Sequence, residues 1–310
     1  MNLKQLRYVI VLSEQGSFSR AAEELNISQP SLSQYVRKIE QEIGIELFDR
    51  SGSVIRLTDA GREYIAAGRK IIDIEHQLMG RFSDIKDNKS GSLSIGISPH
   101  RSVCILPPAI ARFRKLYPGI QVSVDERVGQ ELLDRAERGD YDICIATTPV
   151  DEKIFECVSI MDDECILAVP EGSQTDLELR KKSVGMKERK YPAVDVSLLN
   201  NREFITLAQP QLMQRILSDI CEDYDISIMK PVVCTSLSAT AALVAEGVGC
   251  ALIPSSILNY GMKGISCYSV KQDIPHRNIV VLYRKGQLLS KAVRDLIKIL
   301  KNEKNIKPEE

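Results

Sequence analysis

From Ser92 onward the chain alternates short apolar runs, rich in β-branched residues, with segments of helix length. The runs are LSIGIS, QVSVDE, YDICIAT, ECILAVP, EFITLA, VVCTS, GCALIP and NIVVLYR. Runs of this length, apolar nearly throughout and separated by helical segments, are typical of α/β folds with parallel sheets. They are too many for one small sheet, so we expect two α/β lobes.

The first ninety residues have a different pattern. Residues 3–58 contain short helical patterns and one turn-rich hairpin, and residues 59–88 form one unbroken helical pattern. A polar stretch, Lys86–Gly91, then reads as a hinge. We therefore predict an N-terminal unit over 1–58, a linker helix with its hinge over 59–90, and a C-terminal domain over 91–310. Within that domain we predict one subdomain over 91–161 and 268–310 and a second over 162–267.

Composition excludes several classes of protein. A chain of 310 residues with 44% hydrophobic and 27% charged residues can fill two cores, and its net charge of −1 shows no bulk basicity. The apolar run Tyr8–Leu12 is shorter than a secretory signal requires, and no stretch approaches the ~20 apolar residues of a membrane span. The eight cysteines include no C-x-x-C pair. We expect a cytoplasmic protein with no metal, no cofactor and no membrane association.

Residues 18–28 carry a helix–turn–helix signal. Ala21 and Ala22 are small, as the close crossing of two helices requires, and Asn26 begins a short turn. Ser28 is a good N-cap for a following helix, with Pro30 in its first turn. On a helical wheel, one face of that helix is apolar and is expected to lie in the core; it comprises Leu32, Val36, Ile39 and Ile43.

The opposite face of this helix has side chains suited to duplex DNA. Gln34 can bind adenine through two hydrogen bonds in the major groove, and serine fits several base edges. Arg37 and Lys38, further along, suit phosphates. The predicted DNA-binding residues on this helix are Gln29, Pro30, Ser31, Ser33, Gln34, Arg37 and Lys38. The helix alone fits a merely solvated polar face equally well.

The segment after this helix strengthens the DNA-binding interpretation. Gly44–Arg50 and Ser51–Thr58 predict a strand, a glycine turn and a second strand, which together make the wing of a winged helix–turn–helix. Arg50 and Arg56 flank this wing and are predicted to bind phosphates or to enter the minor groove. Thr58 is expected to cap the next helix.

On these residues the chain resembles the LysR-type transcriptional regulators. The resemblance rests on FSRAAEELNISQPSLSQYVRKIEQEIGIELFDR (18–50) and RLTDAGREY (56–64), and more loosely on LPPAIARFRKLYPG (106–119) and ERGDYDICIA (137–146). It implies a winged helix–turn–helix, a linker helix, and a two-lobed α/β effector-binding domain similar to periplasmic binding proteins. Two departures stand out: Ser53 and Val54 replace the basic wing residue that is common in the family, and residues 171–201 form a longer, basic connection that we expect to be a solvated loop.

The long helix carries an apolar stripe near heptad spacing. It comprises Tyr64, Ala67, Ile71, Ile74, Leu78 and Phe82. Such a stripe needs a partner, so we predict a homodimer; packing onto the chain's own C-terminal domain is the alternative. The resemblance implies antiparallel pairing of linker helices and a homotetramer of two dimers. Two-fold symmetry predicts a roughly palindromic promoter site.

Small polar residues recur where the predicted strands of the C-terminal domain end. They are Ser98, His100, Arg101, Ser102, Thr147, Thr148, Thr206, Thr235 and Ser236. Hydroxyls, helix N-termini and one arginine make a natural site for a small organic anion. Ordinary capping of strand ends would explain any one of them. The resemblance implies an effector bound between the two subdomains, which shifts the conformation that the DNA-binding units adopt.

Three other functions remain to be weighed. An enzyme is disfavoured, because the chain has only three histidines and lacks G-x-S-x-G, P-loop and G-x-G-x-x-G motifs. A solute-binding protein would share the two lobes but would not need the first ninety residues. A redox sensor of the same family needs an exposed thiol beside a cation, whereas Cys144, Cys165, Cys234 and Cys250 lie in apolar runs. We predict a sequence-specific regulator whose partners are promoter DNA, a small-molecule effector, further copies of itself and, as an option, RNA polymerase.

Overall fold

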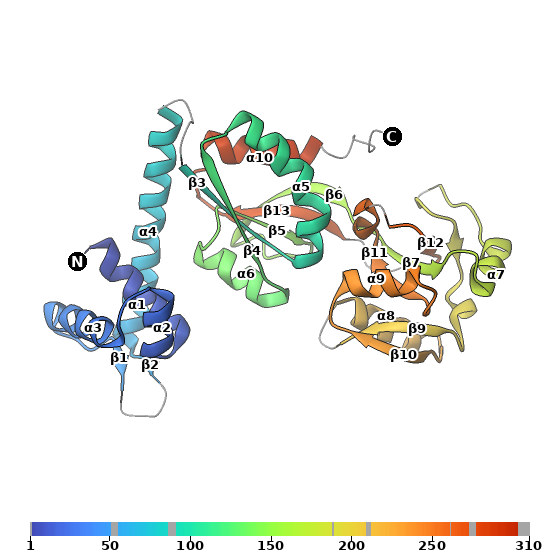
Figure 1. Ribbon diagram of the computed structural model, residues 1–310, viewed down its shortest axis with the longest axis horizontal. Coiled ribbons are helices and arrows are strands. Elements are labelled where there is room, and N and C mark those ends of the chain that lie inside the picture. The colour runs from blue at the N-terminus through green and yellow to red at the C-terminus, as the bar shows by residue number, and fades with distance from the viewer. Residues whose placement is uncertain are drawn as a thin grey trace. The chain divides into compact units, whose positions relative to one another are not determined.

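The computed structural model describes residues 2–50, 55–85, 91–187, 189–208, 212–260, 262–272 and 277–302. The Cα positions group into two compact units, the first built on Met1–Asp87 and the second on Asn88–Gln287 with Lys291–Glu310. Figure 1 labels their elements. No helix within the described residues is both long enough and apolar enough to cross a membrane.

The first unit is a winged helix–turn–helix followed by a long helix (Figure 1). Its elements are α1 (Leu3–Gln15), α2 (Phe18–Glu24), α3 (Gln29–Ile43), β1 (Phe48–Asp49), β2 (Arg56–Leu57) and α4 (Asp59–Ile85). The two strands pair antiparallel, Phe48 opposite Leu57. The wing residues Ser53 and Val54 lie outside the described residues.

Capping residues set the limits of these helices. Ser28 accepts a hydrogen bond from the Ser31 N–H and begins α3, and Gly44 ends it in the left-handed region at φ 78°. Thr58 Oγ1 accepts from the Gly61 N–H at 3.0 Å, as expected of an N-cap of α4. Ala21 and Ala22 are buried, which permits the close helix crossing that the sequence predicted.

The expected core face of α3 is correct except at its end. Leu32, Val36 and Ile39 are buried, whereas Ile43 is 42% exposed. Ile43 lies in the last turn, next to the left-handed Gly44, where the chain leaves the helix. Glu40 is buried instead, because it binds the backbone of the wing.

The first lobe of the second unit is a five-stranded sheet with the order β4-β3-β5-β13-β6. Its strands are β3 (Gly91–Ile97), β4 (Ile120–Glu126), β5 (Ile143–Thr147), β6 (Phe155–Asp162) and β13 (Asn278–Arg284). Figure 1 shows α5 (Pro99–Leu116) and α10 (Lys291–Asn302) on one face of the sheet and α6 (Gly129–Arg138) on the other. The helix α5 continues through Pro107 and Pro108.

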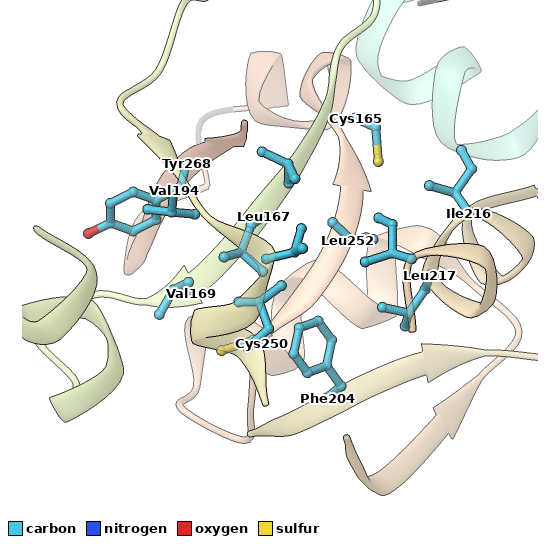
Figure 2. Packing of buried hydrophobic residues seen from close by; sticks show 14 of the residues in the cluster. Cys165, Leu167, Val169, Val194, Phe204, Ile216, Leu217, Cys250, Leu252 and Tyr268 are labelled. Atoms are coloured by element: carbon cyan, nitrogen blue, oxygen red, sulfur yellow. The ribbon is translucent and has the colours of Figure 1, made fainter. Parts of the chain in front are cut away.

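The second lobe has its own sheet, in the order β11-β7-β12-β8, and a parallel pair β10-β9. Its elements are β7 (Cys165–Pro170), α7 (Gln174–Lys182), β8 (Ala193–Val194), η1 (Val196–Leu199), β9 (Glu203–Leu207), α8 (Leu212–Asp223), β10 (Met229–Cys234), α9 (Leu237–Ala245), β11 (Ala251–Pro254), η2 (Ser255–Tyr260) and β12 (Ile265–Val270). Figure 2 shows the core of this lobe, where Leu167, Leu252 and Phe204 are buried together.

Three sequence expectations need correction. The sheets are mixed rather than parallel, because β13 runs antiparallel to β5 and β6, and β7 antiparallel to β11 and β12. The return to the first lobe comes after Val270 and not at 268, since Tyr268 is buried in the core of the second lobe. Residues 171–201 are not one solvated loop: they contain α7, η1 and β8, which pairs with β12.

Candidate functional site

The outward face of α3 is the first candidate site. Gln29, Pro30, Gln34, Arg37 and Lys38 are exposed along it, and Ser31 and Ser33 are partly exposed. Within the described part of the chain, neither Arg37 nor Lys38 forms an ion pair, so both charges are available to a ligand. The N-terminal turns therefore present amide and hydroxyl groups, and the later turns present cations. This is the order in which a recognition helix uses them on bases and on phosphates.

Two aromatic rings support the N-terminal helices behind this face. The rings of Tyr8 and Tyr35 are 5.1 Å apart, and Lys4 Nζ lies 5.6 Å from the centre of the Tyr8 ring. Tyr35 is 41% exposed and directly follows Gln34. The contact joins α1 to α3 and fixes the position of the recognition face.

The base of the wing is held by a buried carboxylate. Glu40 Oε1 accepts hydrogen bonds from the Leu47 and Phe48 N–H groups at 2.9 and 3.2 Å, and Oε2 pairs with Arg50 at 2.5 Å. The Arg50 guanidinium also lies over the Phe18 ring. Of the two arginines predicted to flank the wing, Arg50 is thus paired within the unit although it is exposed, and Arg56 is also exposed. Sequence reasoning did not single out Glu40.

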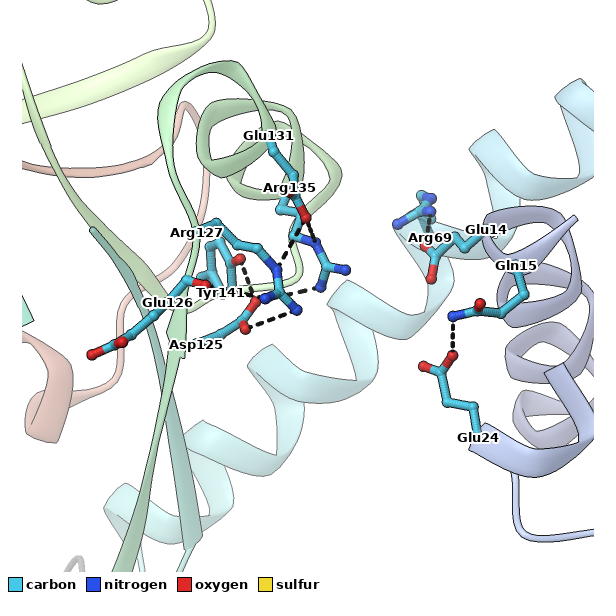
Figure 3. A network of polar contacts seen from close by, with 10 residues as sticks. All are labelled: Glu14, Gln15, Glu24, Arg69, Asp125, Glu126, Arg127, Glu131, Arg135 and Tyr141. Atoms are coloured by element: carbon cyan, nitrogen blue, oxygen red, sulfur yellow. Dashed lines mark hydrogen bonds and ion pairs between the residues drawn. The ribbon is translucent and has the colours of Figure 1, made fainter. Parts of the chain in front are cut away.

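The apolar stripe of α4 divides into two parts. Tyr64 packs against the core of the helix–turn–helix, and Arg69 pairs with Glu14 of α1 (Figure 3). Further along, three large apolar side chains at intervals of four residues are exposed: Ile74 by 63%, Leu78 by 47% and Phe82 by 48%. Of the other predicted dimer residues, Ala67 is exposed and Ile71 is partly buried. The exposed part is the candidate surface for pairing with a second chain.

A second candidate site lies where two parallel strands of the first lobe end. Ser98 follows β3 and caps α5, and Thr147 is the last residue of the neighbouring β5. Arg101, on the first turn of α5, donates to Ser98 Oγ at 2.9 Å and reaches Thr147 Oγ1 at 3.5 Å. His100 Nδ1 lies 3.4 Å from Ser98 Oγ. The structure thus brings four of the predicted effector residues together.

Burial gives this cluster an unusual electrostatic character. The pKa of His100 is lowered to about 3, first by burial and then by the positive charges of Arg101 and Arg277. Burial also lowers the pKa of Arg101, to about 10, and Asp163 partly offsets that effect. At neutral pH His100 is therefore uncharged and Arg101 is charged. The cluster suits an anion better than a cation.

The remaining predicted effector residues have local roles in the structure. Ser102 Oγ donates to the Pro99 carbonyl and to Glu126, and Thr148 Oγ1 accepts from the Asn278 N–H. Ser236 caps α9 by accepting from Ala239 N–H. Thr206 is buried in β9, and Thr235 is exposed before α9. Among the described residues, Thr206 and Ser236 form no hydrogen bond with the Arg101 cluster.

Two charged residues of the site were missed by sequence reasoning. Asp163 and Arg277 are almost fully buried in the two segments that cross between the lobes, and the Asp163 N–H donates to the Arg277 carbonyl at 2.9 Å. They are more than a hundred positions apart in the chain. The one available signal was their position beside the predicted crossings, next to the strands ECILAVP and NIVVLYR.

A polar network fixes the strand end next to Ser98. Asp125 accepts from the Tyr141 hydroxyl at 2.7 Å and pairs with Arg127 and Arg135, and Glu131 pairs with both arginines (Figure 3). The Arg127 N–H donates to the Ile97 carbonyl at 3.1 Å. The network therefore joins β4 and α6 and holds the end of β3, from which Ser98 begins α5.

The thiols and the potential metal ligands show no reactive centre. Burial is the main cause that raises the pKa of the thiols of Cys104, Cys144, Cys157, Cys165, Cys221, Cys250 and Cys267. A reactive thiol requires the opposite shift. Among the described residues, no three histidine, cysteine or acidic side chains are placed to hold a metal ion.

Comparisons with known proteins agree with this architecture. Residues 3–62 match the model of the bacterial regulatory helix-turn-helix protein, lysR family, and residues 86–305 match the LysR substrate binding domain. The chain is 27% identical to an uncharacterized HTH-type transcriptional regulator of Bacillus subtilis (strain 168), covering 94% of this chain and 91% of the relative. It is 29% identical to the hydrogen peroxide-inducible genes activator of Haemophilus influenzae, covering 93% and 92%.

Solved structures share the fold at low sequence identity. A full-length OxyR variant from Pseudomonas aeruginosa superposes with a TM-score of 0.69 at 23% identity, covering 97% of this chain and 98% of that one. Full-length CbnR complexed with its target DNA gives 0.58 at 20% identity, covering 97% and 99%. At these identities the likeness concerns the fold.

Proposed function

This chain belongs to the LysR family of bacterial transcriptional regulators, and we propose that it binds promoter DNA through the outward face of α3 and responds to a small organic anion bound beside Arg101. The observation that carries the DNA-binding part is the exposed sequence of groups on α3, from Gln34 to Arg37 and Lys38. CbnR, a regulator of the same fold, has been crystallised with its target DNA.

The order of side chains on α3 supports different roles for them on the duplex, first contact with bases and then contact with phosphates. Gln34, near the N-terminus, has an amide that can form two hydrogen bonds to adenine, which gives sequence preference. Arg37 and Lys38 lie a turn later, where phosphates pass the helix, and they give affinity without sequence information. Pairing of two chains through Ile74, Leu78 and Phe82 would place two such helices on one duplex.

The effector part rests on the buried cluster at the end of β3 and β5. Arg101 supplies a buried positive charge and Ser98 and Thr147 supply hydroxyls, which together are suited to a carboxylate or a comparable anion. An effector that binds one conformation of the two lobes better than another shifts the population of DNA-binding conformations. The coupling free energy between effector binding and DNA binding is typically about 1–3 kcal/mol in such systems.

A thiol-based sensor is the alternative within the family, since a hydrogen peroxide-inducible genes activator is among the relatives. The thiols argue against it here, because burial or partial burial raises the pKa of seven of the eight. Even Cys104, whose pKa the nearby Arg101 tends to lower, has a pKa raised to about 11 by burial. Deprotonation is the first step of thiol oxidation, so these side chains are poor peroxide sensors.

Two substitutions on α3 test the DNA-binding proposal. Binding of the full-length protein to its own promoter fragment is measured against shuffled fragments over a range of salt concentrations. Gln34→Ala should cost about 1–3 kcal/mol on the cognate site and relax the preference at one base pair. Arg37→Ala should weaken binding to all sequences alike and reduce the salt slope by about one unit.

A matched control lies in the second unit. Arg138 is an exposed arginine near the end of α6, and Arg138→Ala should leave both the sequence preference and the salt slope unchanged. If Gln34→Ala kept the full sequence preference, α3 would not read the bases through this residue. If no fragment bound the wild-type protein more tightly at low salt, the proposed function would be wrong.

A further inference from the structure

The crossing between the two lobes contains three buried charges that do not balance. Arg101, Arg277 and Asp163 have exposed fractions of only 8%, 4% and 0%. Arg101 belongs to α5, and the other two belong to the two segments that connect the lobes. Among the described residues of the crossing, two buried positive charges therefore share one buried negative charge. Buried ions require compensation, because removing a charge from water costs several kcal/mol per ion even after relaxation.

Hydrogen bonds do not remove the imbalance. Asp163 Oδ1 accepts from the Ser256 N–H at 3.1 Å, whereas Asp163 Oδ2 lies 3.6 Å from Arg277 Nη2, too far for a hydrogen bond. Among the described residues, Arg101 Nε, Arg277 Nε and Nη2, and Asp163 Oδ2 have no hydrogen-bond partner. Buried donors of this kind are satisfied in most proteins, by protein, water or ligand.

Among the described residues, the other side chains next to Arg101 are neutral. His100 is held neutral by burial and by the two arginines, and its Nε2 is also buried without a partner among the described residues. Ser98 and Thr147 contribute neutral hydroxyls to Arg101. Within the part of the crossing that the structure describes, one buried positive charge is therefore uncompensated and several N–H donors are unused.

We propose that Arg101 and Arg277 bind a single carboxylate group of the effector and that Asp163 limits the ligand to one negative charge at this place. The proposal rests on the proposed function and names the chemical class of the effector as a monocarboxylate. One carboxylate neutralises the remaining positive charge and accepts from the unused guanidinium donors. A phosphate dianion would place a second negative charge beside Asp163 Oδ2, where like charges repel.

The test uses simple probes on the full-length protein. Melting temperature is measured in titrations with acetate, with its neutral counterpart acetamide and with inorganic phosphate, at constant ionic strength. A ligand that binds only the folded state raises the melting temperature. Acetate should stabilise the protein, acetamide should not, and phosphate should stabilise it less than acetate does.

Variants assign the effect to the named residues. Arg277→Gln and Arg101→Gln should each weaken acetate binding about tenfold or more. Arg277→Lys keeps the charge and should retain part of the response, and Arg138→Gln should retain all of it. Asp163→Asn removes the competing charge, so phosphate should then stabilise the protein at least as well as acetate. This reversal remains measurable if one arginine variant fails to fold.

The inference is overturned if acetate and acetamide have equal effects, if Arg277→Gln responds like the wild type, or if Asp163→Asn leaves acetate the better ligand. Each of these results would leave promoter binding untouched. Conversely, a protein that binds acetate as described but no promoter fragment would contradict the proposed function alone. The two failures are thus distinguished by measuring both properties on the same sample.

Discussion

Glu40 is a buried carboxylate that connects the recognition helix to the wing. Glu40→Ala leaves the Leu47 and Phe48 N–H groups and the Arg50 guanidinium without their acceptor. Loss of an acceptor from buried donors costs about 1–3 kcal/mol for each unsatisfied group. We expect the variant to lose about 2 kcal/mol or more of local stability, measured as faster hydrogen exchange of the peptide that contains Leu47 and Phe48.

The control for this variant lies on the same helix. Glu42 is exposed on α3, so Glu42→Gln should leave the exchange of that peptide unchanged. Equal protection in the Glu40→Ala variant and the wild type would show that Glu40 does not hold the wing.

His100 predicts a specific dependence of stability on pH. Its pKa is lowered from 6.5 to about 3, first by burial. Below pH 6.5 the unfolded chain therefore binds a proton at this position that the folded chain does not, so stability falls as the pH drops from 6.5 toward 3. In His100→Asn the melting temperature should fall less between pH 6.5 and 5 than in the wild type. Parallel curves would contradict the buried, neutral state of His100.

The sequence predicts single residues well where a local rule governs them. Ser28 and Thr58 cap their helices, and Leu32 lies in the core, because capping and helical periodicity depend on near neighbours in the chain. No such local rule predicts that Asp163 and Arg277 lie together. They meet only because the chain crosses between the lobes twice, so their contact depends on topology that no local pattern contains.

At the scale of elements, the two longest strands that were missed contain polar residues. The strand β6 (FECVSIMD) mixes acidic residues, serine and cysteine with apolar ones, and the strand β12 (ISCYSV) mixes serine and cysteine with them, so neither reads as a continuous apolar run. Both pair with strands far away in the sequence, β13 and β7 respectively. Their omission explains why the return crossing was placed too early. The parallel expectation failed for another reason: β13 with β5 and β7 with β11 are antiparallel pairs of strands that were predicted, and no local pattern gives the direction of pairing.

The exposed apolar side chains of α4 predict that the protein forms an oligomer. Leu78→Glu puts a charge in the middle of the exposed stripe of Ile74, Leu78 and Phe82, and an unpaired charge in an apolar helix interface is strongly unfavourable. We expect a smaller assembly than the wild type, with the same helix content, by size-exclusion chromatography with light scattering. Lys70→Glu, at an exposed position earlier on the helix, should not change the size. A monomeric wild type would refute the pairing.

At the scale of the whole molecule, the chain combines a DNA-binding unit with a domain whose two lobes are joined by two crossing segments. A small ligand bound to the buried charges at the crossing would act on both lobes. Arg101 belongs to one lobe, and Asp163 caps η2 of the other through Ser256. The sequence predicted this architecture of two lobes and a helix–turn–helix, because the helix–turn–helix motif and the alternation of apolar runs with helical segments are local patterns. It could not predict the charge balance at the crossing.

The central claim is that two copies of α3 bind one promoter. A DNase I footprint of the full-length protein on its promoter tests it most directly, because each recognition helix should protect one half-site. We predict two protected half-sites with related sequences, about one helical turn apart or a multiple of it, and loss of the paired pattern with Leu78→Glu. Protection of a single isolated half-site by the wild type, or no protection at all, would contradict the account.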